Sequence, residues 1–178
     1  MPIDPLRVEA LKRKIRDVPD FPKPGIVFKD ITTLLKDAEG FRETVDLFVE
    51  LCRERPVDQV VAIESRGFIL GSVVASRLGT GFIPVRKPGK LPAKTARASY
   101  ALEYGQDSLE IHEDALRKGE RVLIVDDVIA TGGTAKAVAE LVEGLGASVA
   151  MYAFLVELTF LPGREKLKGY DVRSLIAF

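Results

Sequence analysis

The chain has 178 residues, 47% of them hydrophobic, and its 26 basic and 26 acidic side chains leave no net charge. This length fits one domain over residues 1–178, and the charge balance argues against an extended basic surface for nucleic acid. Cys52 is the only cysteine, which excludes an intramolecular disulfide, and one cysteine with one histidine argues against a zinc site.

No apolar segment of the sequence is long enough to span a bilayer. The longest apolar run, from Val149 to Val156, falls far short of the roughly 20 residues needed. The N-terminal stretch MPIDPLRVEALKRK has no apolar signal-peptide core. We therefore expect a soluble, cytoplasmic protein that does not bind membranes.

The N-terminal third is predicted to contain two helices separated by a proline-rich segment. The first helix is indicated by apolar residues at helical spacing, which are Val8, Leu11, Ile15 and Val18. Three prolines between residues 19 and 24 then exclude a helix, and Gly25 adds a turn. A second apolar stripe predicts a helix from Phe41 to Cys52 that ends near Pro56.

Strands and helices are then expected to alternate. Short apolar, β-branched runs predict buried strands at residues 59–63, 82–86, 121–125 and 148–156, and helices are expected at 68–78 and 138–145. Such alternation favours an α/β fold, with a Rossmann-like, mostly parallel sheet covered by helices on both faces. The residues after Leu175 are expected to end in a final strand.

The alternation breaks between Lys87 and Lys118. Residues 87–94 read KPGKLPAK, and a long loop of this kind in a compact domain is usually functional or disordered. Beyond it, residues 99–104 and 108–112 can pair as a β-hairpin.

Residues 122–134, which read VLIVDDVIATGGT, have the composition of a phosphate-binding loop. Asp126 and Asp127 stand at the carboxyl end of the apolar run, where parallel sheets bind ligands. The two glycines allow backbone N–H groups to turn toward an anion, and the following helix adds its positive N-terminus. The aspartates can accept hydrogen bonds from ribose hydroxyls or contact a magnesium ion. The remaining loop residues expected to hold a phosphate are Ala130, Thr131, Gly132, Gly133 and Thr134.

A strand–turn–helix junction capped by an aspartate is the structural alternative for this string. The string is neither a GxxxxGK[ST] loop nor a GxGxxG fingerprint. It resembles the signature of the type I phosphoribosyltransferases, which use phosphoribosyl pyrophosphate (PRPP). This resemblance implies that residues 130–134 hold the 5-phosphate of PRPP and that Asp126 and Asp127 face the ribose hydroxyls.

Three further segments resemble the adenine-specific members of that family. They read FPKPGIVFKDIT at residues 21–32, ESRGF at 64–68 and SYALEYG at 99–105. The order of all four segments matches the family from about Leu11 to Leu175. The resemblance implies synthesis of AMP and pyrophosphate from adenine and PRPP, a homodimer, and an N-terminal base-binding hood within residues 1–40.

The hood segment is expected to bind adenine. Phe28 offers a ring on which a purine can stack, worth about 1–3 kcal/mol, and the backbone of Val27 and Lys29 is implied to read the purine edge. A core aromatic beside a loop is the alternative for Phe28. A backbone carbonyl accepts from an exocyclic amino group but repels a keto oxygen, which favours adenine over hypoxanthine or guanine.

Cations near the expected phosphate loop are implied to bind pyrophosphate. Arg66 can pair with two pyrophosphate oxygens and stabilise the departing charge. It shares a turn with Glu64 and Ser65, which are also expected to bind pyrophosphate and whose peptide bond the resemblance implies to be cis. Lys87 and Lys90 are implied to hold pyrophosphate, with Arg86 reaching a neighbouring subunit's site. The alternatives are a helix-capping turn and a solvated basic loop.

Glu103 is the expected catalytic residue, because the resemblance places it near N7 of the purine, where a carboxylate can accept the proton that the base loses. Mg²⁺ is the implied cofactor, held mainly by PRPP and pyrophosphate, with Asp126 and Asp127 as candidate ligands from the protein. Two rival functions stay open: a phosphoribosyltransferase for xanthine or hypoxanthine, and a non-catalytic regulator that senses PRPP.

Overall fold

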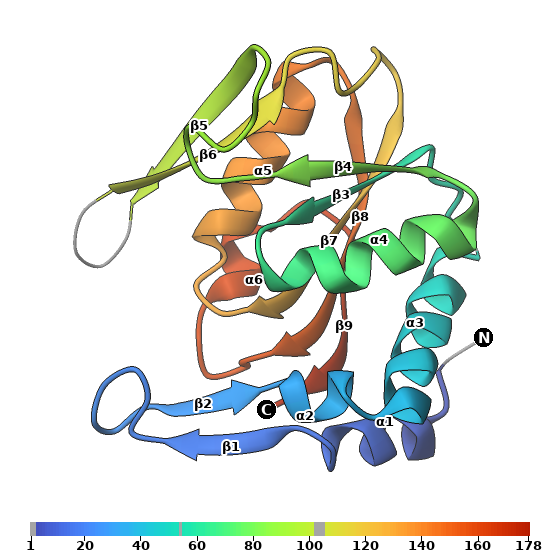
Figure 1. The fold of residues 1–178 in the computed structure, drawn as a ribbon, viewed down its shortest axis with the longest axis vertical. Helices are drawn as coiled ribbons and strands as arrows, with labels where there is room; N and C mark the ends of the chain where they lie inside the picture. Colours follow the sequence, from blue (N-terminus) through green and yellow to red (C-terminus); the bar gives the residue numbers. More distant parts are fainter. Residues whose placement is uncertain (1–2, 54, 102–105) are drawn as a thin grey trace.

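The protein is described from a computed structural model that covers residues 3–53, 55–101 and 106–178, and Figure 1 shows its fold. The helices of these residues are α1 (Pro5–Lys12), α2 (Thr32–Leu35), α3 (Ala38–Cys52), α4 (Arg66–Leu78), α5 (Gly133–Gly144) and α6 (Gly163–Lys166). The strands are β1 (Arg16–Pro19), β2 (Val27–Asp30), β3 (Gln59–Ile63), β4 (Gly81–Val85), β5 (Thr95–Ala101), β6 (Gln106–His112), β7 (Arg121–Ile129), β8 (Ser148–Glu157) and β9 (Val172–Ala177).

Five of the strands form a parallel sheet in the order β4-β3-β7-β8-β9. Alternate residues of β3 enter two separate cores, because successive side chains of a strand point to opposite faces. Val60 and Ala62 pack with α1, α3 and α4, whereas Val61 and Ile63 pack with α5 and β6. The predicted α/β fold, with a parallel sheet covered on both faces, is confirmed.

Two antiparallel hairpins flank the edge of the sheet toward which β3, β4 and β7 point (Figure 1). The hairpin β1–β2 comes from the segment expected to form the hood, and β5–β6 follows the lysine-rich loop. The hairpin β5–β6 was expected from residues 99–112, and it begins earlier, at Thr95. Residues 102–105, which follow β5 in the sequence, lie outside the described part of the chain.

The predicted first helix is too long. It ends at Lys12, so that Val8 and Leu11 lie on α1 while Val18 lies on β1, opposite Phe28 of β2. Val18 therefore fitted the helical spacing only by coincidence, because its position is set by strand pairing with Phe28. Asp4 caps the true helix by accepting a hydrogen bond from the backbone N–H of Leu6 at 2.9 Å.

The strand predicted at residues 121–125 is too short. β7 continues to Ile129, because β8 pairs with it as far as the partners Ile129 and Glu157. Asp126 and Asp127 consequently lie within the strand and not at its end. Local sequence could not show this extension, since the partner strand supplies the pairing.

Helix α3 agrees with its prediction and covers one face of the sheet. Asp37 caps its start by accepting from the N–H of Gly40 at 2.9 Å, and its apolar stripe faces the core. Cys52 is buried there, and desolvation raises the pKa of its thiol to about 11. Among the described residues, no helix combines the length and apolar character that a membrane crossing requires.

Replacing Phe48 of α3 by alanine should lower the free energy of unfolding by about 3–5 kcal/mol, since the side chain is fully buried and leaves a cavity. Urea unfolding of the two proteins measures the difference. Leu6→Ala is the control, because Leu6 is 78% exposed and its loss should cost no more than about 0.5 kcal/mol. Equal losses for the two variants would contradict the assigned core.

Candidate active site

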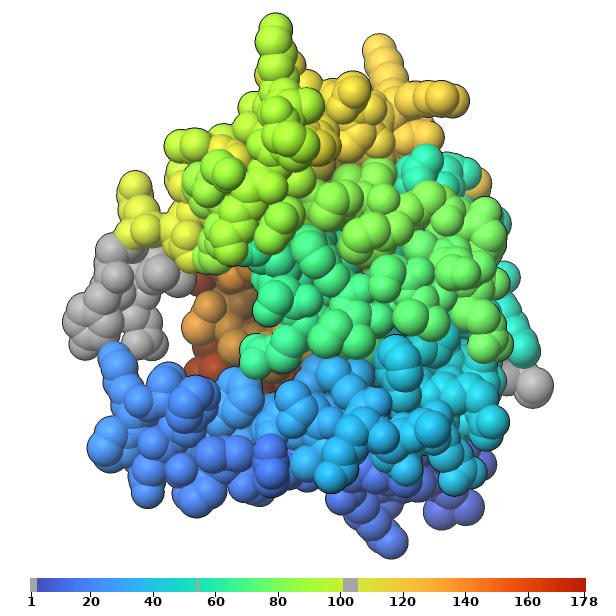
Figure 2. Space-filling model, viewed as in Figure 1, coloured from blue at the N-terminus to red at the C-terminus, as the bar shows by residue number. Residues whose placement is uncertain are grey.

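A cavity of about 380 Å³ opens at the carboxyl edge of the sheet. Its walls come from the turn after β3, from the end of β7 with the loop that follows it, and from Lys87 and Tyr100. The cavity exists because β3 pairs with β7 only as far as Ala62 and Val125, after which β3 turns away. Figure 2 shows the same face hollowed between the blue N-terminal segment and the green segment of α4.

The loop after β7 is held from behind by the start of α6. Gly132 has a φ of 74°, and an added Cβ there would lie 2.4 Å from the carbonyl oxygen of Gly163. A Cβ on Gly163 would in turn lie 2.4 Å from the carbonyl oxygen of Ala130. Both positions therefore require glycine, the first for its backbone angle and both for close backbone approach.

The open side of this loop carries the residues expected to bind a phosphate. Ala130, Thr131, Gly132 and Thr134 line the cavity, whereas Gly133 is the first residue of α5 and does not line it. The N-terminus of a helix of this length carries partial positive charge. The arrangement predicted from the glycines, a loop leading into a helix at the end of an inner strand, is present.

The two aspartates of β7 have different surroundings. Asp127 accepts a hydrogen bond from Nε of Arg66 at 2.5 Å and is almost fully buried. Asp126 accepts from the backbone N–H of Asp127 at 2.9 Å, and a Cβ on Gly67 would lie 2.8 Å from its Oδ1. Desolvation and then the charge of Asp127 raise the pKa of Asp126 well above its ordinary value. Asp126 therefore holds a proton at a higher pH than an exposed aspartate.

Arg66 links the sheet to the hood hairpin. Its guanidinium carbon lies 5.2 Å from the centroid of the Phe28 ring, a cation–π distance. Phe21 packs edge-on against the same ring, with centroids 5.3 Å apart. The structure thus places the Phe28 ring beside Arg66, the residue that donates to Asp127.

The other two residues predicted to bind adenine lie on β2 beside Phe28. Val27 is 47% exposed, and the ammonium of Lys29 donates to Asp17 at 2.7 Å and lies 4.1 Å from the centroid of the Phe178 ring. The side chain of Lys29 is thus occupied away from the cavity. The prediction concerned the backbone of these two residues, and it stays a prediction.

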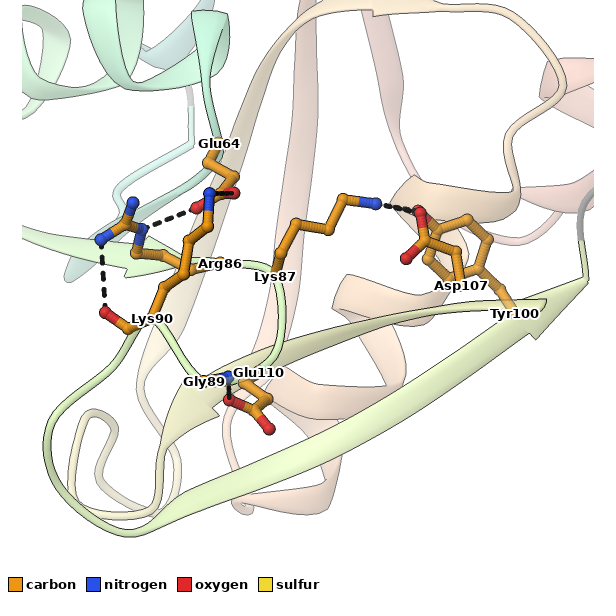
Figure 3. Close-up of polar contacts among 8 residues, drawn as sticks. All are labelled: Glu64, Arg86, Lys87, Gly89, Lys90, Tyr100, Asp107 and Glu110. Carbon is orange, nitrogen blue, oxygen red and sulfur yellow. Dashed lines mark hydrogen bonds and ion pairs between the residues drawn. The ribbon is translucent and has the colours of Figure 1, made fainter.

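The expected cis peptide between Glu64 and Ser65 is present. Glu64 accepts from Nε of Arg86 at 2.6 Å and pairs with Nζ of Lys90 at 3.1 Å (Figure 3). Burial alone would raise the pKa of Glu64, but its bonds to the two cations outweigh burial and lower it. Of the four cations predicted to hold pyrophosphate, Arg66 and Lys87 line the cavity, whereas Arg86 and Lys90 neutralise Glu64.

Three residues that sequence reasoning did not single out also belong to this region. Tyr100 and Leu109, from the hairpin β5–β6, line the cavity, and Gly163 supports the loop. Strand alternation could have placed Tyr100 and Leu109 on one face, but nothing in the sequence linked Gly163 to the loop. The predicted catalytic residue Glu103 lies outside the described residues.

Comparison with known families agrees with this geometry. The profile of the family described as Phosphoribosyl transferase domain matches residues 31–175, a range that contains the loop, the aspartate pair and Arg66. The chain belongs to the phosphoribosyltransferase family.

The relatives narrow the assignment within that family. Adenine phosphoribosyltransferase from Thermotoga petrophila is 60% identical over 94% of this chain and 99% of its own length. The crystal structure of adenine phosphoribosyltransferase from Thermoanaerobacter pseudethanolicus superposes with a TM-score of 0.94, at 57% identity over 96% of this chain and 99% of the other. The Saccharomyces cerevisiae enzyme, complexed with an imino-altritol bisphosphate and adenine, gives 0.91 at 43% identity, over 96% and 98%. The chain is a member of the adenine phosphoribosyltransferase branch.

Gly163→Ala should weaken the binding of AMP, used here as a probe of the phosphate loop, by about tenfold. The added methyl group overlaps the carbonyl of Ala130, and relieving such overpacking costs about 1–3 kcal/mol. Calorimetric titration measures the change. Gly144→Ala is the matched control, because a Cβ there meets no atom within 4 Å. Wild-type affinity in Gly163→Ala would contradict the support that we assign to this contact.

Proposed function

We propose that the protein transfers the phosphoribosyl group of PRPP to adenine, giving AMP and pyrophosphate in purine salvage. The observation that carries this proposal is the shared cavity, in which the loop of residues 130–134, the aspartates of β7, Arg66 and Lys87 surround one space. In that space the loop can bind one anion, the carboxylates can accept hydrogen bonds from hydroxyl groups, and the cations can bind a second anion. The named relatives support the same reaction.

In this reaction the loop holds the 5-phosphate and the aspartates bind the ribose. Asp127, paired with Arg66, is an acceptor for a ribose hydroxyl. Asp126, whose pKa is raised, is suited to exchange a hydrogen bond with the neighbouring hydroxyl. Together these groups fix C1′ of PRPP at the cavity centre, which lowers the entropic cost of the reaction.

The cations bind the leaving pyrophosphate. Arg66 and Lys87 line the cavity and stabilise the negative charge that develops as the bond from C1′ to oxygen breaks. Lys90 joins them only after exchanging Glu64 for phosphate oxygens. We also propose a homodimer in which Arg86 reaches the neighbouring subunit's site, although in the single chain its guanidinium contacts Glu64.

Mg²⁺ is the proposed cofactor, held mainly through PRPP. Within residues 3–53, 55–101 and 106–178, no group of three or more His, Cys, Asp or Glu side chains is placed to hold a metal. The donor set near the cavity is instead the carboxylate pair Asp126 and Asp127, which fits an ion that binds one or two carboxylates together with substrate oxygens. When bound, Mg²⁺ would neutralise pyrophosphate charge.

Adenine is proposed to bind between the hood and the cavity. Phe28 supplies the stacking face, and the backbone of Val27 and Lys29 reads the purine edge. N9 of the purine then attacks C1′, pyrophosphate departs with the bonding electron pair, and the proton lost by the purine passes to Glu103. We place this activity in the cytoplasm.

The first test is AMP formation by purified protein from adenine, PRPP and Mg²⁺, followed by chromatography. We expect AMP to form, and we expect adenine to outcompete hypoxanthine and xanthine in mixtures, since a keto oxygen meets a backbone carbonyl unfavourably. If the protein preferred an oxopurine, that base would replace adenine as the proposed substrate. Folded protein that binds PRPP without turnover would favour the regulatory alternative.

Glu103→Gln should slow the chemical step by about 100-fold or more, because an amide cannot accept the purine proton. Single-turnover measurements with PRPP and adenine separate this step from product release. Glu113→Gln is the control, since Glu113 is an exposed glutamate just after β6. An unchanged chemical step in Glu103→Gln would remove this residue from the mechanism.

A further inference from the structure

We propose that Asp107, together with Tyr100, is a positioning residue that holds the ammonium of Lys87 at the cavity, ready for the pyrophosphate of PRPP. This role rests on the proposed function, because it concerns how one substrate of that reaction is captured. Neither residue was singled out from the sequence, and both lie on the hairpin β5–β6.

The side chains of Asp107, Tyr100 and Lys87 form a closed triangle. Tyr100 and Asp107 face each other across the hairpin as cross-strand partners, and the tyrosine hydroxyl donates to Oδ2 of Asp107 at 3.2 Å. Nζ of Lys87 forms an ion pair with the same carboxylate oxygen and donates to the tyrosine hydroxyl at 3.4 Å. Figure 3 shows Lys87 extending toward this pair and away from Glu64.

The backbone on either side of Lys87 is fixed independently by Glu110. Arg86 exchanges two backbone hydrogen bonds with Glu110, at 3.0 and 2.8 Å. The N–H of Gly89 donates to Oε2 of Glu110 at 3.0 Å, and Oε1 of that carboxylate accepts from Arg97. Because the main chain is held in this way, the direction of the Lys87 side chain is what Asp107 and Tyr100 decide.

This arrangement leaves Lys87 able to bind an anion. An ammonium group has three N–H donors, and two of them are used by Asp107 and Tyr100. The third remains for a phosphate oxygen. A lysine that is already oriented loses less rotamer freedom on binding than one that moves freely in solvent.

Asp107 also keeps Lys87 charged. Burial lowers the pKa of Lys87, but the bonds to Asp107 and Tyr100 outweigh burial and raise it. When a substrate covers the site and excludes water, desolvation of the ammonium increases further. The cavity is otherwise rich in carboxylates, with Glu64, Asp126 and Asp127 in its walls, so a charged Lys87 matters for attracting pyrophosphate.

A double-mutant cycle on substrate binding tests this role. The dissociation constant of PRPP with Mg²⁺ is measured by calorimetry for the wild type, Asp107→Asn, Lys87→Met and the double variant. We expect Asp107→Asn to weaken PRPP binding about fivefold in the wild-type background but less than about twofold beside Lys87→Met, because Asp107 acts through that lysine.

Two controls separate positioning from a general structural effect. AMP carries the 5-phosphate but no pyrophosphate, so its affinity should be the same in Asp107→Asn as in the wild type. Asp114→Asn makes the same chemical change at an exposed aspartate after β6 and should leave PRPP binding unchanged. If Asp107→Asn folds poorly, Tyr100→Phe takes its place in the cycle. We then expect a smaller loss of PRPP affinity, which should also disappear when Lys87→Met is present.

Several outcomes would overturn the role of Asp107. The first is PRPP binding in Asp107→Asn that is unchanged or tighter than in the wild type. The second is a loss of PRPP affinity from Asp107→Asn that is as large in the Lys87→Met background as in the wild type. The third is a loss of AMP affinity in Asp107→Asn as large as its loss of PRPP affinity. If the wild type itself bound no PRPP, the proposed function would fail first and the positioning role with it. Normal wild-type binding with an additive cycle would reject the positioning role alone.

Discussion

The buried central strand β7 is the constraint on which the site depends. Residues Val122 to Val125 have no exposed surface, because α4 lies over one face of the strand and α5 over the other. A shift of one residue would turn every side chain to the opposite face and break its fit with the side chains packed there, so close packing fixes the register. Since β3 stops pairing at Val125 while β8 continues to Ile129, the last part of β7 has one open side. Asp126 and Asp127 lie on that part, and the glycine-rich loop follows it. The same packing that stabilises the domain thus creates the cavity.

Charge compensation is the second feature that organises the site. Cations expected to meet substrate phosphates are paired with carboxylates: Arg66 with Asp127, Arg86 and Lys90 with Glu64, and Lys87 with Asp107. These pairs hold long, flexible side chains close to where a polyphosphate would bind. Where a cation must leave its carboxylate to reach a phosphate, as Lys90 must leave Glu64, binding exchanges one ion pair for another, so the net gain in affinity is smaller than the sum of the new contacts.

The site is assembled from segments that are distant from one another in sequence. The hood hairpin reaches the sheet through the contact of Phe28 with Arg66, and the hairpin β5–β6 reaches it through Lys87. Both contacts involve side chains that the proposed reaction also uses. Adenine, stacked on Phe28, and pyrophosphate, bound by Arg66, would therefore meet two residues that already contact each other.

The sequence by itself determined the parts of the protein whose cause is local. Continuous apolar runs identified β3, β7 and β8, because strands buried on both faces need apolar side chains at every position. The two glycines at the start of α5 identified the anion loop, since the backbone there must turn within a few residues. Only the tertiary structure decided that Val18 belongs to a strand and not to a helix, that β7 extends through its aspartates, that Gly163 supports the loop, and that Lys87 is held by Asp107. Each of these features depends on a partner that is distant in sequence. The residue pattern of one segment does not show which other segment will pack against it.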